Sequence, residues 1–482
     1  MKFWIGIMSA DPALEVLLLC DRMSGIAATV FDHIDALERF SRHRIRRLEM
    51  LGDIPESVDL NRFDVIIVHY TLVLCADYYV SPAARQRLAE ARALKAMFIQ
   101  DEYRFVDKTI AAMNEIGVDL LFTCVPDEEI GKVYPEQRLP GVTKVNVLTG
   151  YVPARLLKLP LRPLAERSID VGYRSRDLPA WLGRLAQEKM HIGRRFQEDG
   201  ARCGLKLDIS AREEDRLYGN SWIRFVRNCK AMLGVESGAS VFDFTGDIQR
   251  NVEAHVARDP SVGFETLHDL YFADAEDKIR LAQISPRSFE AAALGTLMIM
   301  YEGEYSGILE PWRHYVPLKK DHSNFEAVVA TLRDTKRATE IVAQAYHEIA
   351  LNPRYSFQTA VAQVDDCIAR CMQAEMRATM PAYPTREFRR AAAPALAVRR
   401  KRMRRDAAYA MYRFVFGRLL RWLPDEKRQW AKARTISVLR SLRNGRHFVR
   451  TKLRWPFSVL MHLYRRGRPW LNRRISSFLG DS

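Results

Sequence analysis

Residues 285–301 read SPRSFEAAALGTLMIMY, and this stretch predicts a helix followed directly by a buried strand. Pro286 and Arg287 begin the helix, since proline is favoured at the first helical position. Phe289 and the alanines then face a sheet, while Glu290 lies about one turn into the helix. The run TLMIMY is continuously apolar rather than alternating, which is typical of a strand covered on both faces.

The first 150 residues repeat this alternation of strand and helix. Short apolar runs predict strands at 2–8, 44–51, 64–70, 95–100, 119–125 and 144–148. Amphipathic stretches at 25–40 and 81–94 predict helices, the second with Ser81 before Pro82 at its first position. Such alternation predicts a parallel sheet with helices on both faces.

A second unit of the same kind begins near residue 168. Apolar runs predict strands at 168–173, 205–210, 230–235, 296–301 and 314–318, with helices at 188–200 and 324–334. Residues 150–167 carry three prolines and predict a linker, and the polar stretch 245–286 predicts a helical insertion. The fold class is therefore α/β, with two tandem doubly wound Rossmann-like domains facing a cleft.

The predicted domains are 1–155, 156–380 and a basic helical extension at 381–482. Residues 386–482 hold 27 Lys and Arg against five Asp and Glu, so the excess positive charge belongs to this extension. Tyr412, Phe416 and Trp422 share an apolar helical face beside arginines at 412–423, a composition suited to an anionic membrane surface.

Two other interpretations of the extension stay open. Its apolar face can pack on the body of the protein, and its positive charge can bind nucleic acid. Nucleic-acid binding is disfavoured because no helix-turn-helix, zinc-finger or RNA-recognition pattern is present. No uncharged run approaches the length of a membrane span, so we expect a cytoplasmic protein attached to the inner face of the cytoplasmic membrane.

The stretch SPRSFEAAALGTLMIMYEGEYSGILEPW, supported by QDEYR at 100–104 and DVGYRSR at 170–176, resembles group 1 glycosyltransferases of bacterial surface-polysaccharide biosynthesis. The resemblance covers roughly residues 1–380 and implies the two-domain GT-B fold and a nucleotide-sugar donor. It also implies that Glu290 contacts the nucleotide ribose. Retaining members commonly carry a second glutamate where this chain has Ala282, so retention or inversion of the anomeric centre stays open.

The residues themselves suggest how such a donor is held. Without an Asp-x-Asp motif we expect no metal and no cofactor, so cationic side chains must stabilise the leaving diphosphate. The predicted donor-binding residues are Arg174, Arg176, Lys230, Glu236, Ser237, Arg287, Glu290, Tyr305, Ser306 and Gly307. Some of these residues also have a purely structural explanation. Lys230 begins a strand and so points away from the cleft, and the negative charge of Glu290 can simply stabilise the N-terminus of its helix through the helix dipole.

An inverting reaction also needs a general base on the acceptor side. Asp101 and Glu102 follow the strand predicted at 95–100, and His69 lies at the end of the one predicted at 64–70, where parallel strands end towards a cleft. Asp101 is the first choice, with pairing to Arg104 as the structural alternative. The leading hypothesis is transfer to a cell-surface glycan or lipid-linked acceptor; the other is a non-catalytic GT-B-fold protein of glycan assembly or binding.

Overall fold

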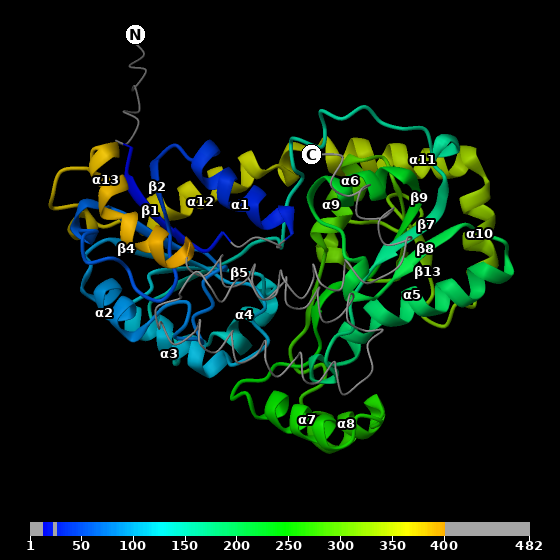
Figure 1. The fold of residues 1–482 in the computed structure, drawn as a ribbon, viewed down its shortest axis with the longest axis horizontal. Helices are drawn as coiled ribbons and strands as arrows, with labels where there is room; N and C mark the ends of the chain where they lie inside the picture. Colours follow the sequence, from blue (N-terminus) through cyan, green and yellow to red (C-terminus); the bar gives the residue numbers. More distant parts are fainter. Residues whose placement is uncertain (1–12, 23–26, 401–482) are drawn as a thin grey trace, which may run out of the picture. The chain divides into compact units, whose positions relative to one another are not determined.

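The computed structural model describes residues 13–22 and 27–400, and Figure 1 shows the arrangement of their helices and strands. The first sheet has the strand order β2-β1-β3-β4-β5-β6, and all its neighbouring pairs are parallel. Its strands are β1 (Glu15–Cys20), β2 (Arg44–Glu49), β3 (Val65–Val68), β4 (Leu94–Phe98), β5 (Leu120–Thr123) and β6 (Thr143–Asn146). The helices between them are α1 (Ala28–Phe40), α2 (Pro82–Glu90), α3 (Val106–Ile116) and α4 (Asp127–Val133).

The second sheet has the order β13-β12-β9-β7-β8 and is also parallel. Its strands are β7 (Ile169–Arg174), β8 (Leu207–Ser210), β9 (Cys229–Gly234), β12 (Leu297–Tyr301) and β13 (Val316–Leu318). Its helices are α5 (Arg184–Arg202), α6 (Gly219–Asn228), α9 (Pro286–Ala293), α10 (Phe325–Arg333) and α11 (Thr335–Ala345). The two sheets confirm the predicted α/β fold with two doubly wound, Rossmann-like domains.

Local sequence explains most of these elements. Strand β3 (VIIV) is buried along its whole length, as expected of a parallel strand covered on both faces. Helix α2 begins as predicted, with Pro82 at its first turn and the Ser81 hydroxyl accepting a hydrogen bond from the Ala84 amide. In α9, Pro286 again occupies the first turn, and Phe289 packs in the core with Met298 and Met300.

Strand β1 forms from EVLLLC, a run for which the sequence pattern predicted no element. The strand predicted at residues 2–8 lies outside the described residues. Strand β1 is fully buried between β2 and β3, because every one of its side chains can be covered by helices on one face or the other.

The last described helices pack on the first sheet. Helix α12 (Phe357–Cys371) lies within the range given to the second domain, yet its buried face shares a core with β1 and α1. Helix α13 (Thr385–Ala391) places Phe388 against Phe63 in the same domain. Residues 383–395 therefore belong to the packed body, while the amphipathic stretch predicted at 412–423 lies outside the described residues.

The predicted insertion is helical but also contains a strand. Helices α7 (Asp247–Arg258) and α8 (Phe264–Tyr271) follow β10 (Ser237–Ala239), and β11 (Leu281–Gln283) closes the excursion. Strands β10 and β11 pair with each other in antiparallel register. In the described part of the chain, no helix combines the length and the apolar character that crossing a membrane requires.

Candidate functional site

A cavity of about 490 Å³ lies at the carboxyl ends of the second sheet's strands and has walls from both domains. Gly234, Val235 and Ser237 at the end of β9 and the neighbouring helix α9 supply much of its surface. Ala27 and Asp101 reach it from the first domain. The carboxyl edge of a doubly wound sheet is where ligands of such folds bind, so the cavity is the candidate site.

The charged residues around this cavity are mostly basic. Arg176 follows β7, Lys189 lies on α5, Arg216 precedes α6 and Arg287 begins α9. Asp101 is the acidic residue of the lining. Four cationic side chains facing one carboxylate favour a ligand with several negative charges, such as a diphosphate.

Helix α9 presents its first turn to the cavity. Ser285, Arg287 and Ser288 line the wall. The Arg287 and Ser288 amides donate to Ser285 Oγ and to the Ser285 carbonyl at 3.4 and 2.9 Å, so this turn attracts an anion through the Arg287 charge and the helix dipole. The Arg287 guanidinium donates from Nη1 to the Arg174 carbonyl at 2.5 Å and lies 5.2 Å from the centre of the Trp222 ring. These two contacts hold Arg287 at the cavity, and its predicted contact with the donor stays a prediction.

Lys189 is a cavity residue that the sequence analysis missed. Burial, and then repulsion from Arg287, lowers the pKa of its ammonium group to about 8, while Asp101 acts in the opposite direction. Lys189 follows the helical spacing of the buried residues Ile192 and Phe196, so it lies on the face of α5 that turns inward. A lysine on the apolar face of the predicted helix was the signal that could have found it.

Glu290 is held differently from the expectation. Its side chain is buried and accepts a hydrogen bond from Trp222 Nε1 at 2.8 Å, while Ser288 and Ala291 on either side line the cavity. Burial raises the pKa of the Glu290 carboxyl, whereas the Trp222 hydrogen bond and the charges of Arg287 and Arg155 lower it. Trp222 itself lines the cavity and Glu290 does not, so contact of Glu290 with a ribose stays a prediction.

Asp101 lies where a base on the acceptor side is expected. It lines the cavity opposite the cations, with its backbone at φ 56°, a left-handed conformation that is uncommon for aspartate. Its Oδ1 accepts a hydrogen bond from the Tyr103 hydroxyl at 2.9 Å. The hydrogen-bond partner of the Asp101 carboxylate is thus the Tyr103 hydroxyl, whereas the structural alternative predicted from the sequence was pairing with Arg104.

Glu102 and His69 turn away from the cavity, contrary to the sequence analysis. Glu102 is buried and accepts hydrogen bonds from the Tyr134 hydroxyl at 2.5 Å and the Cys124 amide at 2.6 Å. Burial raises the pKa of its carboxyl to about 7. His69 is buried with its Nε2 3.0 Å from His33 Nδ1, and burial lowers its pKa. Their placement gives no support to a role in proton transfer at the cavity.

The two arginines after β7 have different surroundings. Arg176 lines the cavity. The Arg174 guanidinium instead donates to the carbonyls of Asp208 and Asp215 at 2.8 and 3.0 Å, and to Asp208 Oδ1 at 2.8 Å. It also lies 4.3 Å from the centre of the Phe225 ring. Its donors hold β7 to β8, so the expected diphosphate contact would require these bonds to break.

Of the polar residues expected to contact the sugar, Ser237 lines the cavity and the others support the chain behind it. Glu236 is buried, and its Oε1 accepts from the amides of Glu304 and Tyr305 at 3.0 and 2.8 Å. Tyr305, Ser306 and Gly307 form the left-handed turn η5, with φ of 47°, 56° and 67°. Ser306 Oγ accepts from the Ile284 amide at 3.2 Å, which ties this turn to the residues before α9.

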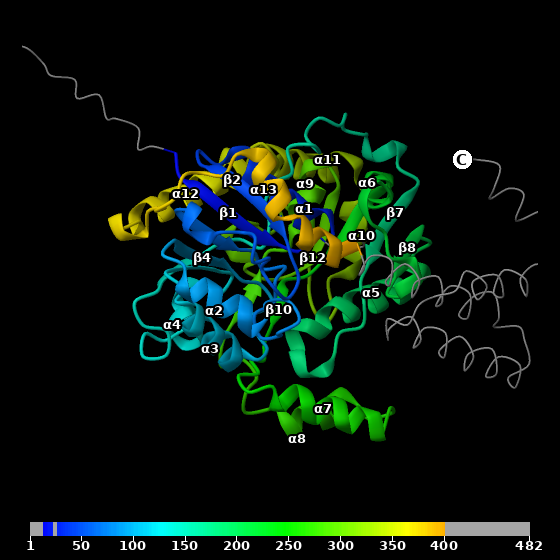
Figure 2. The same cartoon turned by 60° about the vertical axis from the view of Figure 1, so that its left-hand side comes forward.

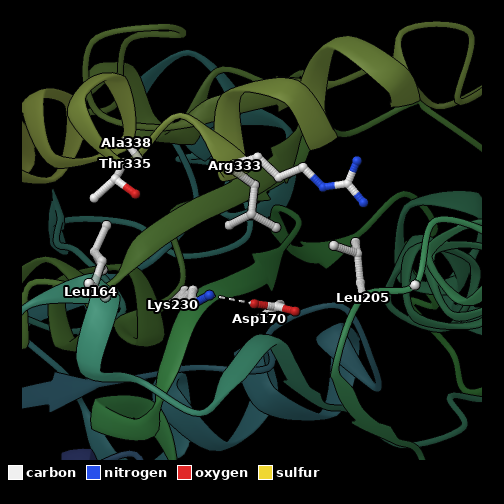
Figure 3. Close-up of a pocket in the computed structure, with 10 residues that line it drawn as sticks. Leu164, Asp170, Leu205, Lys230, Arg333, Thr335 and Ala338 are labelled. Atoms are coloured by element: carbon white, nitrogen blue, oxygen red, sulfur yellow. Dashed lines mark ion pairs between the residues drawn. The ribbon is translucent and has the colours of Figure 1, made fainter.

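Lys230 lies at the opposite end of its strand from the candidate site. Its Nζ pairs with Asp170 Oδ1 at 2.7 Å in a second cavity of about 280 Å³ (Figure 3). Leu164, Leu205 and Leu332 form apolar walls there. The structure gives no support to the predicted donor contact of Lys230, because the first residues of parallel strands lie at the other edge of the sheet from the last.

The sequence analysis expected no metal. Among residues 13–22 and 27–400, no three His, Cys, Asp or Glu side chains gather in a way that could hold a metal ion. The charges that the cavity itself provides are those of its arginines, Lys189 and Asp101.

No protein-family model matches this chain, and no curated protein matches it either. Solved structures of similar shape include an alpha-glucosyltransferase in complex with UDP-glucose and DNA containing an abasic site, at 9% identity over 74% of this chain and 100% of that chain, with a TM-score of 0.45. HepE of Anabaena in complex with UDP has 10% identity over 74% of this chain and 99% of that chain, with a TM-score of 0.42. A glycosyltransferase from Rickettsia africae has 8% identity over 75% of this chain and 100% of that chain, with a TM-score of 0.42. Because these TM-scores lie below 0.5, the interpretation of the cavity rests on its own residues.

Proposed function

We propose that this protein is a glycosyltransferase that takes a sugar from a nucleotide-sugar donor bound in the cavity between the two domains. The observation that carries the proposal is the convergence of Arg176, Lys189, Arg287 and the first turn of α9 on a cavity that Asp101 faces from the other domain. Fixed positive charge aimed at one place is what a leaving diphosphate requires.

The remaining lining suits the rest of a donor. Tyr173, Trp222 and Met232 form an apolar wall on which the base and ribose can lie. In the transfer, the bond between the sugar's anomeric carbon and the diphosphate oxygen breaks, and the diphosphate keeps the electron pair. A new bond forms to the acceptor oxygen, whose proton passes to Asp101 if the reaction inverts the anomeric centre.

The direct test is calorimetric titration with a nucleoside and its mono- and diphosphates in the uridine, guanosine, adenosine and thymidine series. We expect the diphosphate of one series to bind at least about tenfold more tightly than its nucleoside, because charge-assisted contacts are each worth roughly 1.5–3 kcal/mol. Lys230→Met is a matched control, since this lysine lies at the other edge of the same sheet. Equal affinity for nucleoside and diphosphate in every series would contradict the proposal.

Catalysis is tested separately from binding. Hydrolysis or transfer from the matching nucleotide-sugars, followed by release of the diphosphate, distinguishes an enzyme from a protein that only binds the donor. We propose that the reaction needs no metal, because Arg176, Lys189 and Arg287 line the cavity in which the diphosphate would lie. Turnover that disappears with EDTA and returns with magnesium or manganese would refute this part.

The acceptor that we propose is a cell-surface glycan or lipid-linked glycan, reached at the inner face of the cytoplasmic membrane. The strongly basic composition of residues 386–482 supports attachment to an anionic surface. Within the described residues, Arg386, Arg389 and Arg390 are exposed on α13, while Phe388 is buried against the body. Co-sedimentation with vesicles of phosphatidylglycerol, against vesicles of phosphatidylcholine as control, tests the attachment.

A further inference from the structure

Between β9 and α9 the chain leaves the second domain in a long excursion, residues 237–283, which we call the strap. Its ends form a two-stranded stem in which Ser237 is opposite Gln283 and Ala239 is opposite Leu281. Ser237 lines the candidate donor cavity, so the strap starts at the cavity edge. Figures 1 and 2 show its helices α7 and α8 lying together, away from both sheets.

Near the stem, the strap forms backbone hydrogen bonds with the first domain. The Asp243 amide donates to the Tyr103 carbonyl at 2.8 Å, and the Asp107 amide donates to the Phe244 carbonyl at 3.0 Å. A parallel bridge between Arg104 and Asp243 lies between these two bonds. The strap, which belongs to the second domain in sequence, thus pairs through its backbone with the loop that follows β4 in the first domain.

The strap also contributes side chains to the apolar core of the first domain. Phe242, Ile279 and Leu281 are buried in the cluster that contains Val106 and Ile110 of α3. Phe244 packs against the same cluster, with the Arg138 guanidinium 6.0 Å from the centre of its ring. Lifting the strap would expose this apolar surface, so the contact is a stable part of the described structure.

The loop that the strap contacts has an uncommon backbone. Asp101 and Phe105 have φ of 56° and 51°, values that cost free energy in residues other than glycine and persist only when neighbours enforce them. Gly246 of the strap lies so close to Phe105 that a Cβ at this position would approach the ring to 2.0 Å. Tyr103 lies between these two residues in sequence, and its hydroxyl donates a hydrogen bond to Asp101 Oδ1.

We propose that the strap holds the loop at residues 101–105 against the donor cavity and so keeps Asp101 facing the cations of the second domain. Phe244 and Tyr103 are then positioning residues: Phe244 keeps the strap on the first domain, and Tyr103 orients the Asp101 carboxylate. The role of Asp101 as base rests on the proposed function above. The consequence is that the two walls of the site stay assembled before the donor binds.

The test compares Phe244→Ala, Phe244→Tyr, Tyr103→Phe and the control Leu270→Ala, an exposed residue on α8. Hydrogen exchange measures the amides of Asp107 and Asp243, which the strap pairing protects. We expect both amides to exchange at least about tenfold faster in Phe244→Ala than in the wild type or in Leu270→Ala. If these two amides exchange in the wild type as fast as free loop amides do, the proposal that the strap holds the loop is refuted. This outcome does not depend on what the cavity binds.

Kinetics then test the positioning of Asp101. With whichever of UDP-glucose, UDP-N-acetylglucosamine, GDP-mannose or dTDP-rhamnose is turned over, we expect Phe244→Ala and Tyr103→Phe to lower kcat by at least about tenfold. The dissociation constant of the corresponding nucleoside diphosphate should change less than about threefold, because its cationic contacts lie in the second domain. Phe244→Tyr keeps the ring and should restore kcat.

Three results are decisive. If Phe244→Ala does not fold, Tyr103→Phe decides the kinetic question, because it removes only a hydroxyl. An unchanged kcat in Tyr103→Phe would overturn the positioning role. If no nucleotide or nucleotide-sugar binds to the wild type, the proposed function fails, while the exchange measurement still decides whether the strap holds the loop.

Discussion

Replacing Lys189 with methionine tests the diphosphate site most directly. The lysine is the cavity cation whose pKa burial lowers to about 8, so its charge changes within the working pH range. Methionine fills a similar volume without the charge. Loss of one charge-assisted contact, worth roughly 1.5–3 kcal/mol, should weaken diphosphate binding by about tenfold to a hundredfold at pH 7.

The pH dependence gives this prediction a second, independent signature. Because the pKa is lowered to about 8, Lys189 is charged below that pH and loses its proton as the pH rises through it. If the diphosphate binds only the charged form, its affinity should be about tenfold lower at pH 9 than at pH 7. In Lys189→Met the affinity should be low at both values and nearly independent of pH.

The assay is calorimetric titration of the nucleoside diphosphate that binds best, at pH 7, 8 and 9. The parent nucleoside is titrated in parallel and should show neither effect, since it carries no phosphate. Lys230→Met should keep both the affinity and the pH dependence of the wild type. The reasoning is refuted if Lys189→Met binds the diphosphate as the wild type does, or if the pH dependence persists without the lysine.

Three further predictions concern other parts of the molecule. Glu290→Gln keeps a hydrogen-bond acceptor for Trp222 but removes the negative charge. We expect donor affinity or turnover to fall about tenfold to a hundredfold, with an almost unchanged Tm. Loss of folding in this variant would instead show a structural role for Glu290. Arg167 is buried and donates to four backbone carbonyls. We expect Arg167→Met to lower the free energy of unfolding, measured by urea titration, by about 3 kcal/mol or more. The affinity of the folded fraction for the diphosphate should stay unchanged. A chain ending at Arg400 should fold and no longer sediment with phosphatidylglycerol vesicles. A chain ending at residue 384 should also have a lower Tm, because it lacks the core residue Phe388. A lower Tm for the chain ending at Arg400, or sedimentation equal to that of the full chain, would contradict the membrane role of the extension.

Features that depend on neighbouring residues were predictable from the sequence. Apolar runs such as DVIIVHY identified buried strands, and Ser81 with Pro82 marked the start of α2. Pro286 similarly marked the start of α9 and so located one wall of the cavity. These features follow from periodicity and capping, which act over one or two turns of chain and need no knowledge of the fold.

Side-chain direction at the strand ends was not predictable in this way. Asp101 and Glu102 are adjacent in the sequence, yet Asp101 faces the cavity and Glu102 turns back to Thr123 and Tyr134. The left-handed backbone at Asp101 separates them, and the sequence carries no glycine there to announce it. Lys189 was missed for a related reason. It lies at the cavity together with Arg287, which lowers its pKa, and Arg287 is about a hundred residues further along the chain.

The sequence by itself determined the two doubly wound sheets, the helical character of most of the insertion, the position of α9 and the strongly basic extension. Only the tertiary structure decided that α12 covers the first sheet, that the strap pairs with the loop after β4, and that Lys189 joins Arg176 and Arg287 around one cavity. The physical reason is the range of the interactions involved. Strand and helix patterns are set by adjacent residues, whereas these contacts join segments that lie far apart in sequence and whose meeting depends on packing of the whole body.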